Sequence, residues 1–408
     1  RRSVVGTPLV CGTGDAGQLG LGEDIVERKF PALVKQLIAQ GIEVVDVAAG
    51  GMHTVVLDKS GNLWSWGCND QFALGRSSKE DEGYLPQRME VTDEDVRFVK
   101  AVCADSMTVA LSEAGTVYTC GTFRNSRGSL GFDPDTDVQD KLTIVRPLAG
   151  FVVVDVSCGV DHVLALTDSG VIFQWGSGEQ SQLGRRVLER REIQAAVPRE
   201  LWLPGVKIIG AGSYCSFAYT HDGTLYAWGL NNFNQTGIDP EDGGLATDIL
   251  QPTRVRALSV PGMSPVVQIH GGEHHTVARL ENGEVWAWGR GDFGQLGLPL
   301  DRVRELNQEL VKERGDEAEH VSAHKLAVAR PQQVTAFKRP VQWIGVGGNH
   351  NLAVDSQATV YSWGYGNSLQ LGSGEEDDVE VPEPVAGQQL QGKGCLVATG
   401  GGHHSVLL

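Results

Sequence analysis

One module recurs along the whole sequence, and this repetition limits the possible folds more than any other feature of the chain. The module reads V-x-V-x-x-G-x-x-H-x-x-x-L-x-x-x-G-x-V-x-x-W-G-x-x-x-x-x-Q-L-G, with departures in individual copies. Six copies are complete, and they span Val45–Gly75, Val99–Gly131, Val153–Gly184, Val206–Gly237, Val267–Gly297 and Gln342–Gly372.

A seventh copy is divided between the two ends of the chain. Leu396–Leu408 carries its front half, and Pro8–Gly20 carries its back half. A circular array of sheets leaves two open edges unless its first and last strands pair within one blade. The split copy therefore predicts one closed domain over residues 1–408. Its units end near residues 20, 75, 131, 184, 237, 297 and 372.

Each module has the pattern of a small antiparallel sheet. Apolar residues alternate over four or five positions and stop at Gly, Asp or Asn, as in HTVVLDKSGNLWSWG from His53 to Gly67. Period-two alternation between tight-turn residues is typical of β-strands. The sequence thus predicts an all-β fold, a seven-bladed β-propeller closed by a blade that both termini share.

An insertion at residues 299–331 lengthens the last repeat. Its apolar residues Val303, Leu306, Leu310 and Val311 follow helical spacing among charged residues, which predicts a short surface helix. Either loop decoration between blades or a dedicated partner site would account for it.

Charge and cysteine content exclude several classes of function. The chain has 34 Lys and Arg against 51 Asp and Glu, and a net charge of −17 opposes general binding to a phosphate backbone or an anionic membrane. No apolar run reaches the roughly 18 to 20 residues that span a bilayer. The seven cysteines include no C-x-x-C pair, which disfavours a disulfide framework and a structural zinc site. We expect a monomer without metal or cofactor, and a partner with a basic surface.

The repeat resembles that of the regulator of chromosome condensation family over essentially the whole chain. The similarity is strongest in GTGDAGQLGLGEDIVERKFPALV (Gly12–Val34), AGGMHTVVLDKSG (Ala49–Gly61), WGCNDQFALGR (Trp66–Arg76) and GGEHHTV (Gly271–Val277). This resemblance implies a propeller that catalyses guanine nucleotide exchange on the small GTPase Ran with one face and binds histones of the nucleosome, and so chromatin in the nucleus, with the other. The basic amino-terminal tail through which the family contacts DNA is absent from this sequence.

The resemblance also assigns roles to particular residues. Asp105, Asp161 and His274 match the three positions that the family uses for exchange, although residues capping turns would also fit. On the same face it places Asp15, His53, Phe123, Arg124, Arg185 and His404. Phe123 and Arg124 correspond to an inserted wedge of the family within TFRNSRG, a segment that equally suits an ordinary turn.

One basic segment, RRVLERR, stands out on this acidic chain between two modules. The resemblance places there a loop that presses arginines into the acidic patch of a histone dimer, and guanidinium groups suit that contact. Arg186, Arg190 and Arg191 are the candidates. A solvated charged surface is the alternative.

The recurring His and Trp residues have a simpler interpretation. Histidines repeat at His53, His162, His274, His350 and His403 or His404, while Met107 replaces the histidine in the second unit. They could gather near the axis around a metal or ligand, but a packing and hydrogen-bonding role fits a residue repeated in most blades better. Tryptophans before the module glycine are expected in the core, or in a light sensor as in a plant photoreceptor relative.

Two further readings follow from the same residues. Gly12, Gly14 and Gly17 spell G-x-G-x-x-G, but the pattern recurs after W-G elsewhere in the chain, which favours a turn within a blade over a dinucleotide site. A propeller that serves only as an interaction scaffold, without exchange activity, is the alternative function.

Overall fold

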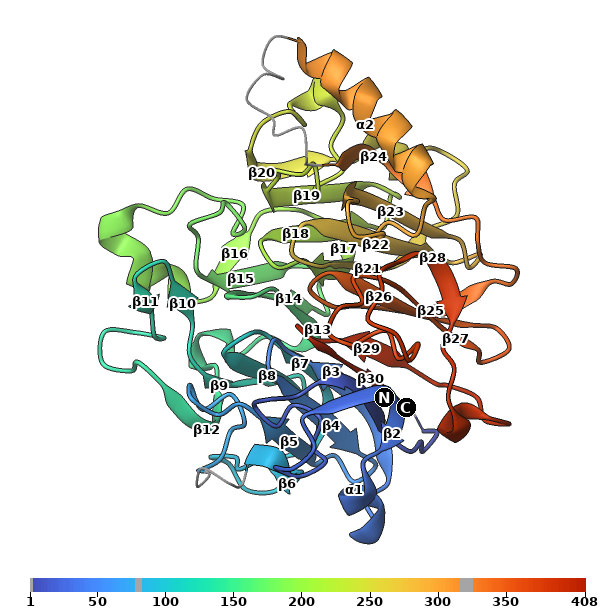
Figure 1. Cartoon of the computed structure of the whole chain (residues 1–408). Coiled ribbons are helices and arrows are strands. Elements are labelled where there is room, and N and C mark those ends of the chain that lie inside the picture. Colours follow the sequence, from blue (N-terminus) through green and yellow to red (C-terminus); the bar gives the residue numbers. More distant parts are fainter. Residues whose placement is uncertain (1–2, 78–82, 316–325) are drawn as a thin grey trace.

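The computed structural model describes residues 3–77, 83–315 and 326–408, and its strands include seven four-stranded antiparallel sheets. Figure 1 shows these sheets following one another around a common centre in sequence order, with the two termini side by side. The predicted seven-bladed β-propeller is confirmed. We number the blades in chain order, from blade 1, which begins at Val44, to blade 7, which both termini build.

The strands occupy four equivalent positions in each blade. The innermost strands are β3 (Val44–Ala49), β7 (Phe98–Cys103), β13 (Val153–Cys158), β17 (Val206–Ala211), β21 (Val266–Gly271), β25 (Val341–Val346) and β29 (Ala398–Gly400). The second strands are β4 (His53–Asp58), β8 (Met107–Ser112), β14 (His162–Thr167), β18 (Cys215–Thr220), β22 (His275–Leu280), β26 (His350–Asp355) and β30 (His404–Leu407).

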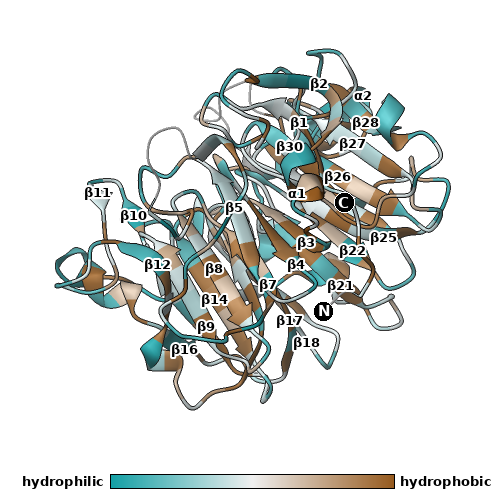
Figure 2. Cartoon of the chain, turned by 90° about the horizontal axis from the view of Figure 1, so that it is seen from below, coloured by the Kyte–Doolittle hydropathy of each residue, from teal (hydrophilic) through white to brown (hydrophobic). Residues whose placement is uncertain are grey.

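The other two positions complete each blade. The third strands are β5 (Leu63–Gly67), β9 (Val117–Gly121), β15 (Ile172–Gly176), β19 (Leu225–Leu230), β23 (Val285–Arg290), β27 (Val360–Gly364) and β1 (Leu9–Thr13). The outermost strands are β6 (Gln87–Arg88), β12 (Gln139–Ile144), β16 (Arg199–Leu201), β20 (Asp248–Arg254), β24 (Ala327–Gln333), β28 (Val379–Pro384) and β2 (Glu27–Leu33). In Figure 2 hydrophobic positions concentrate on strands such as β8 and β14, whereas the outer strand β2 is largely hydrophilic.

Strands from both ends of the chain form blade 7 and so close the ring. The sheet order is β2-β1-β30-β29, and Gly12 of β1 lies opposite His404 of β30. Each innermost strand contacts the innermost strand of the next blade, including β29 against β3. Strand pairing within blade 7 thus joins residues almost 400 positions apart, as the split repeat predicts.

The glycine of the W-G pair brings two loops of each blade close together. Gly176 has a φ of 118°, and a Cβ there would lie 2.3 Å from the carbonyl oxygen of Asp161. A side chain is therefore excluded both by conformation and by space. The next residue, Ser177, donates its N–H to that oxygen at 2.7 Å. This glycine thereby determines the position of the loop that carries Asp161.

The repeated histidine links each blade that carries it to the following blade. His53 Nε2 lies 3.0 Å from Thr108 Oγ1, and that hydroxyl donates to the carbonyl oxygen of Ala73 at 2.8 Å. The corresponding pairs are His162 with Ser216, His275 with Asn351, His350 with Ser405 and His404 with Thr54. All five imidazoles are buried. We call them the histidine belt, and their predicted packing and hydrogen-bonding role is confirmed.

The structure corrects the sequence alignment of this belt by one residue in blade 5. His275, and not His274, stands at the repeated position, and in the split blade the belt residue is His404. His275 lies opposite Gly289 in the pairing of β22 with β23, as His162 lies opposite Gly176 in blade 3. Either of two adjacent histidines satisfies a linear pattern, and only strand register decides between them.

We predict that Thr108→Val destabilises the protein by roughly 1 to 3 kcal/mol. The substitution preserves shape but removes the hydroxyl that bonds both His53 and Ala73, and so leaves the buried His53 Nε2 without a partner. Urea unfolding monitored by tryptophan fluorescence measures the change. Thr143→Val is the matched control, since its hydroxyl bonds to Lys141 in the same outer strand. Equal stability of the two variants would contradict the linking role of the belt.

The insertion before the last repeat forms the expected helix, α2 (Leu300–Arg314). Val303, Leu306 and Leu310 are buried against the blades, whereas Val311 is 38% exposed. Glu380 of β28 accepts a hydrogen bond from the Leu300 N–H at 2.9 Å. Residues 316–325 of the predicted insertion lie outside the described residues.

Candidate functional site

The loops between the first and second strands of the blades meet at one end of the propeller axis. They surround a cavity of about 620 Å³, lined largely by glycines such as Gly51, Gly159 and Gly401. Backbone hydrogen bonds join these loops from blade to blade, for example Val160 N–H to Ser213 O at 3.0 Å. We call this cavity the axial mouth. Its walls are largely backbone, so the side chains at its rim determine its chemistry.

Asp105 stands at the rim on the loop of blade 2. Its carboxylate lies against blade 1, because a Cβ at Gly51 would be only 2.6 Å from Asp105 Oδ1. Burial among the loops raises the pKa of Asp105, the charge of Glu273 raises it further, and the Arg124 guanidinium lowers it. Asp105 is exposed at the rim, yet the loops around it place it in one electrostatic environment with Glu273 and Arg124.

Asp161 occupies the rim on the neighbouring blade 3. Its Oδ1 accepts a hydrogen bond from the Arg124 backbone N–H at 2.8 Å. Burial raises the pKa of this carboxyl to about 7, an effect that the Arg124 N–H opposes and that Asp105 strengthens. The structure thus brings together two of the three predicted exchange residues, with Arg124 of the predicted wedge between them.

Two further residues complete this acidic rim. Tyr214 on blade 4 lines the axial mouth, and its pKa is raised by burial and by Asp105, Asp161 and Glu273. Glu273 on blade 5 accepts a hydrogen bond from Asn349 Nδ2 at 2.9 Å. Neither residue was predicted to have a role. Glu273 nonetheless leaves a signal in the sequence, since most other copies carry a small residue at its loop position, whereas the position of Tyr214 holds residues of very different size.

His274, the third predicted exchange residue, lies on blade 5 beside a different group of side chains. Its ring packs against Phe233, with centroids 4.7 Å apart. Arg290 lies over the same Phe233 ring, 5.1 Å from its centroid, and pairs with Asp292 at 2.6 Å. His274 is half-buried, so it remains on the same face as Asp161 without belonging to the acidic pair.

Three residues predicted for the binding face lie in the interior instead. His53 and His404 belong to the histidine belt and are 1% and 0% exposed. Phe123 is 0% exposed and packs against Phe132, with centroids 5.4 Å apart. The two histidines begin strands that are buried along their whole length, and Phe123 belongs to a hydrophobic core cluster. Phe123 therefore anchors the hairpin that carries Arg124.

The other predicted face residues are accessible. Asp15 and Arg124 are exposed, and Arg185 is half-buried. Within the described part of the chain, Nε and Nη2 of Arg185 have no hydrogen-bond acceptor, and burial followed by the charge of Arg199 lowers the pKa of the guanidinium. An incoming acceptor would satisfy these two nitrogens.

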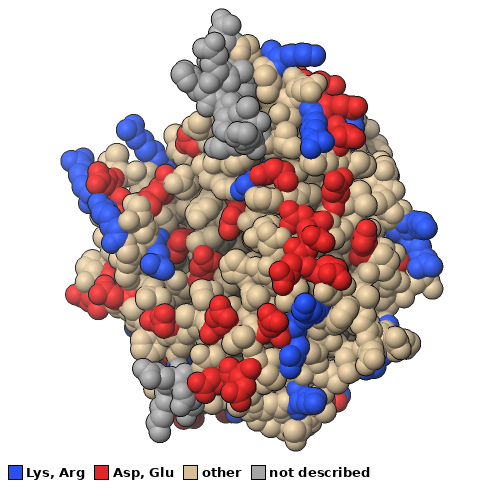
Figure 3. Space-filling view, in the orientation of Figure 1, with Lys and Arg blue, Asp and Glu red and all other residues tan. Residues whose placement is uncertain are grey.

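The predicted histone-binding arginines are also on the surface. Arg186, Arg190 and Arg191 are exposed on the segment that follows β15, and the last two lie in η3 (Glu189–Ala196). Figure 3 shows basic side chains along the left edge of the molecule, where Figure 1 places β10 (Arg124–Asn125) and β11 (Gly128–Ser129), while acidic side chains spread over the middle. Acidic side chains also lie among the basic ones at this edge.

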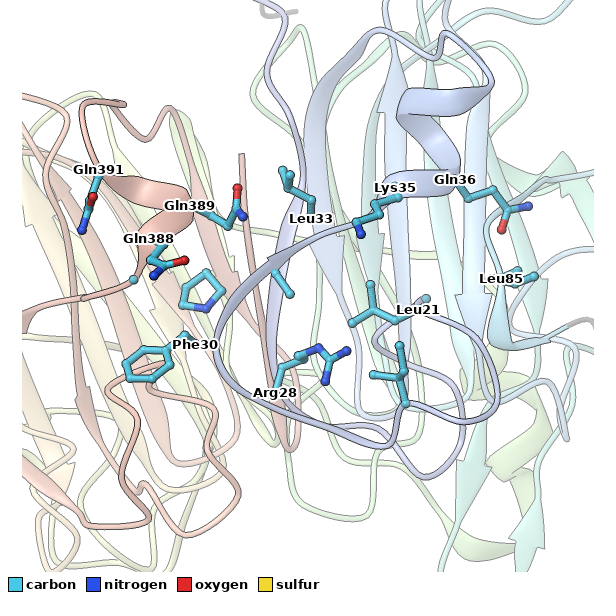
Figure 4. Close-up of a pocket in the computed structure, with 15 residues that line it drawn as sticks. Leu21, Arg28, Phe30, Leu33, Lys35, Gln36, Leu85, Gln388, Gln389 and Gln391 are labelled. Atoms are coloured by element: carbon cyan, nitrogen blue, oxygen red, sulfur yellow. The ribbon is translucent and has the colours of Figure 1, made fainter.

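A larger cavity, of about 810 Å³, lies away from the axial mouth. It is lined by Arg28 and Phe30 of β2 and by Gln388 and Gln389 of η7 (Gln388–Leu390), as Figure 4 shows. None of the predicted site residues lines it. In the described residues no group of three or more His, Cys, Asp or Glu side chains is placed to bind a metal, and no helix could span a membrane.

Comparison with known proteins agrees with this architecture. Residues 7–407 match the model of the family described as RCC1-like domain. Protein pim1 of Schizosaccharomyces pombe is 38% identical over 98% of this chain and 73% of its own length. Guanine nucleotide exchange factor SRM1 of Saccharomyces cerevisiae is 34% identical over 99% of this chain and 87% of its own. The crystal structure of Prp20p from the same yeast superposes with a TM-score of 0.89 at 33% identity, covering 100% and 92% of the two chains.

Proposed function

The chain belongs to the family of RCC1-like domains, and from this premise we propose that it is a guanine nucleotide exchange factor for the small GTPase Ran, held on chromatin in the nucleus through histones. The observation that carries the proposal is the acidic rim of the axial mouth, where Asp105 and Asp161 flank Arg124 of a projecting hairpin. SRM1 is named as an exchange factor, and the study of Prp20p describes binding to Gsp1p and histones.

Nucleotide exchange requires that the propeller bind the empty GTPase more tightly than the nucleotide-bound GTPase, and it involves no covalent step. A nucleotide held at about 1 nM is bound with roughly −12 kcal/mol, and each 1.4 kcal/mol by which the propeller favours the empty GTPase accelerates release about tenfold. By linkage, the propeller and the nucleotide weaken each other's binding equally. The exchange surface must therefore supply several kcal/mol of contacts that the nucleotide-bound GTPase cannot make.

The rim residues suit this task in complementary ways. Arg124 projects from its hairpin as an exposed cation and would disturb the phosphate and magnesium region of the GTPase. Asp105, Asp161 and His274 would hold the loops of the GTPase that Arg124 displaces. The unsatisfied nitrogens of Arg185 would take an acceptor from the same partner.

A basic segment of the surface supports the chromatin part of the proposal. Arg186, Arg190 and Arg191 are exposed on one segment, and guanidinium groups make bidentate contacts with carboxylates. An acidic patch on histones would provide such carboxylates. The last two arginines lie in η3, whose Glu189 and Glu192 bond Arg127 of the hairpin, so the histone contact would lie beside the hairpin that carries Arg124.

Release of fluorescent GDP from Ran tests the proposal. Catalytic amounts of the protein should accelerate release by orders of magnitude, and bovine serum albumin at the same concentration should not. Unchanged release would overturn the exchange function. If the protein failed to accelerate release but still bound nucleosomes, it would instead be an interaction scaffold, which the exposed arginines alone would explain.

A further inference from the structure

Carboxylates of the next blade hold the hairpin that carries Arg124. The hairpin consists of β10 (Arg124–Asn125) and β11 (Gly128–Ser129), only two residues in each strand. A two-stranded ladder this short does not hold its own conformation in water. Its order must therefore come from contacts outside the hairpin.

All four consecutive residues from Arg124 to Arg127 make such contacts. Besides the bond from Arg124 N–H to Asp161, Glu179 accepts two hydrogen bonds from Ser126, one from its N–H at 2.9 Å and one from its hydroxyl at 2.6 Å. Glu192 accepts a hydrogen bond from Asn125 Nδ2 at 3.0 Å and pairs with Arg127. We call Glu179 and Glu192 the hairpin cradle.

The two cradle residues come from one segment of blade 3. Glu179 follows β15, and Glu192 lies in η3 on the outer part of the same blade. The Glu192 side chain is 15% exposed, so it is partly shielded from solvent where it bonds both Asn125 and Arg127. Glu189 adds a more exposed bond to Arg127 at 2.9 Å, with 81% of its side chain accessible. Shielding makes Glu192 the stronger of the two partners of Arg127.

We propose that Glu179 and Glu192 are positioning residues for nucleotide exchange, which hold the hairpin in the conformation that presents Arg124 beside the axial mouth. The inference rests on the proposed exchange function. The cradle acts through the hairpin, since its carboxylates are occupied by Asn125, Ser126 and Arg127. A hairpin ordered in advance avoids the entropy loss of ordering it on the GTPase.

The test compares the double variant Glu179→Ala, Glu192→Ala with the unaltered full chain. Steady-state release of GDP from varied concentrations of loaded Ran should show kcat lowered 10- to 30-fold with KM changed less than threefold. Glu241→Ala is the matched control, because Glu241 pairs with Arg256 in the corresponding loop of blade 4, away from the hairpin. The exchanged pair Arg127→Glu, Glu192→Arg should recover part of the rate lost on Arg127→Glu alone.

A second measurement separates this inference from the exchange function itself. Amide hydrogen exchange of residues 122–130 should become at least tenfold faster in the double variant, while the other blades stay unchanged. If the double variant kept the protection of this segment, or kept its kcat while the unaltered protein accelerates release, the positioning role of the cradle would be contradicted. If the unaltered protein did not accelerate release at all, the proposed function would fail, and the hydrogen exchange would still show whether the cradle orders the hairpin.

Discussion

Lowering the pH from 7.5 to 5 is expected to destabilise the protein by about 5 kcal/mol. Burial lowers the pKa of His53, His270 and His275 to about 4, and that of His162, His350 and His404 to about 3. In the unfolded chain a histidine titrates near 6.5. Below this pH the unfolded state binds more protons than the folded state, so stability is complete above about pH 6.5 and is lost as the pH falls toward 4.

The size of this loss of stability follows from the difference between the folded and unfolded pKa values of the histidines. At pH 5 the gap between the folded and unfolded pKa values costs up to about 2 kcal/mol for each histidine, so the five buried belt imidazoles and the half-buried His270 give an upper bound near 12 kcal/mol. The raised pKa values of Asp105 and Asp161 have the opposite effect, because protonation of these carboxyls stabilises the folded state as the pH falls. Residual burial of histidines in the unfolded chain reduces the expected loss of stability further. A loss of about 5 kcal/mol is a large part of the stability of an ordinary domain.

Urea unfolding at pH 7.5, 6 and 5 measures this loss. The chain also supplies a matched variant, since Met107 stands at the belt position in blade 2. His162→Met should remove up to one proton from the difference in proton binding between the unfolded and folded states. The slope of the free energy of unfolding against pH then falls by up to about 1.4 kcal/mol per pH unit. A free energy of unfolding that stays constant from pH 7.5 to 5 would contradict a neutral buried belt.

Asp161→Asn is expected to slow nucleotide exchange roughly 10- to 100-fold and at the same time to stabilise the fold. A pKa of about 7 in place of 3.8 means that an ionised Asp161 costs at most about 4 kcal/mol at neutral pH. Partial contact with solvent lowers the expected gain to roughly 1 to 2 kcal/mol. Asparagine keeps an oxygen for the Arg124 N–H but removes the charge that would face the GTPase.

Thermal unfolding and GDP release from Ran, both at pH 7.5, check the two effects. Asp168→Asn is the control, because Asp168 is an exposed acid on the turn after β14, at the opposite end of the same blade. We expect it to change neither quantity appreciably. A variant at Asp161 that loses stability, or that exchanges at the normal rate, would show that burial of this carboxylate is unrelated to function.

The repeated positions could be interpreted without coordinates because they are local patterns. Alternation between glycine-containing turns predicted each sheet, and the divided copy at Pro8–Gly20 and Leu396–Leu408 predicted how blade 7 closes. The tryptophans before the module glycine also behave as expected. Trp66, Trp228 and Trp288 are buried, and each donates its Nε1–H to a carbonyl of the preceding blade. Trp202, outside this pattern, is 84% exposed.

The rim of the axial mouth was only partly predictable. Asp105, Asp161 and Arg124 were identified by resemblance, whereas Tyr214 and Glu273 belong to the same charge environment through contacts between distant blades. Carboxylates of the hairpin cradle were likewise missed. Glu179 and Glu192 sit more than 50 residues from their partners, and no local pattern relates the two segments.

The sequence by itself determined that seven like modules form a ring and that the two termini meet in one of them, because strand alternation and turn residues are properties of short segments. Tertiary structure alone decided which side chains of the predicted binding face are exposed and which are buried. His53, His404 and Phe123 are buried, and His275 replaces His274 in the belt. The physical reason is that a shift of one residue in strand register reverses the direction of a side chain, and that register is set by neighbouring strands and blades.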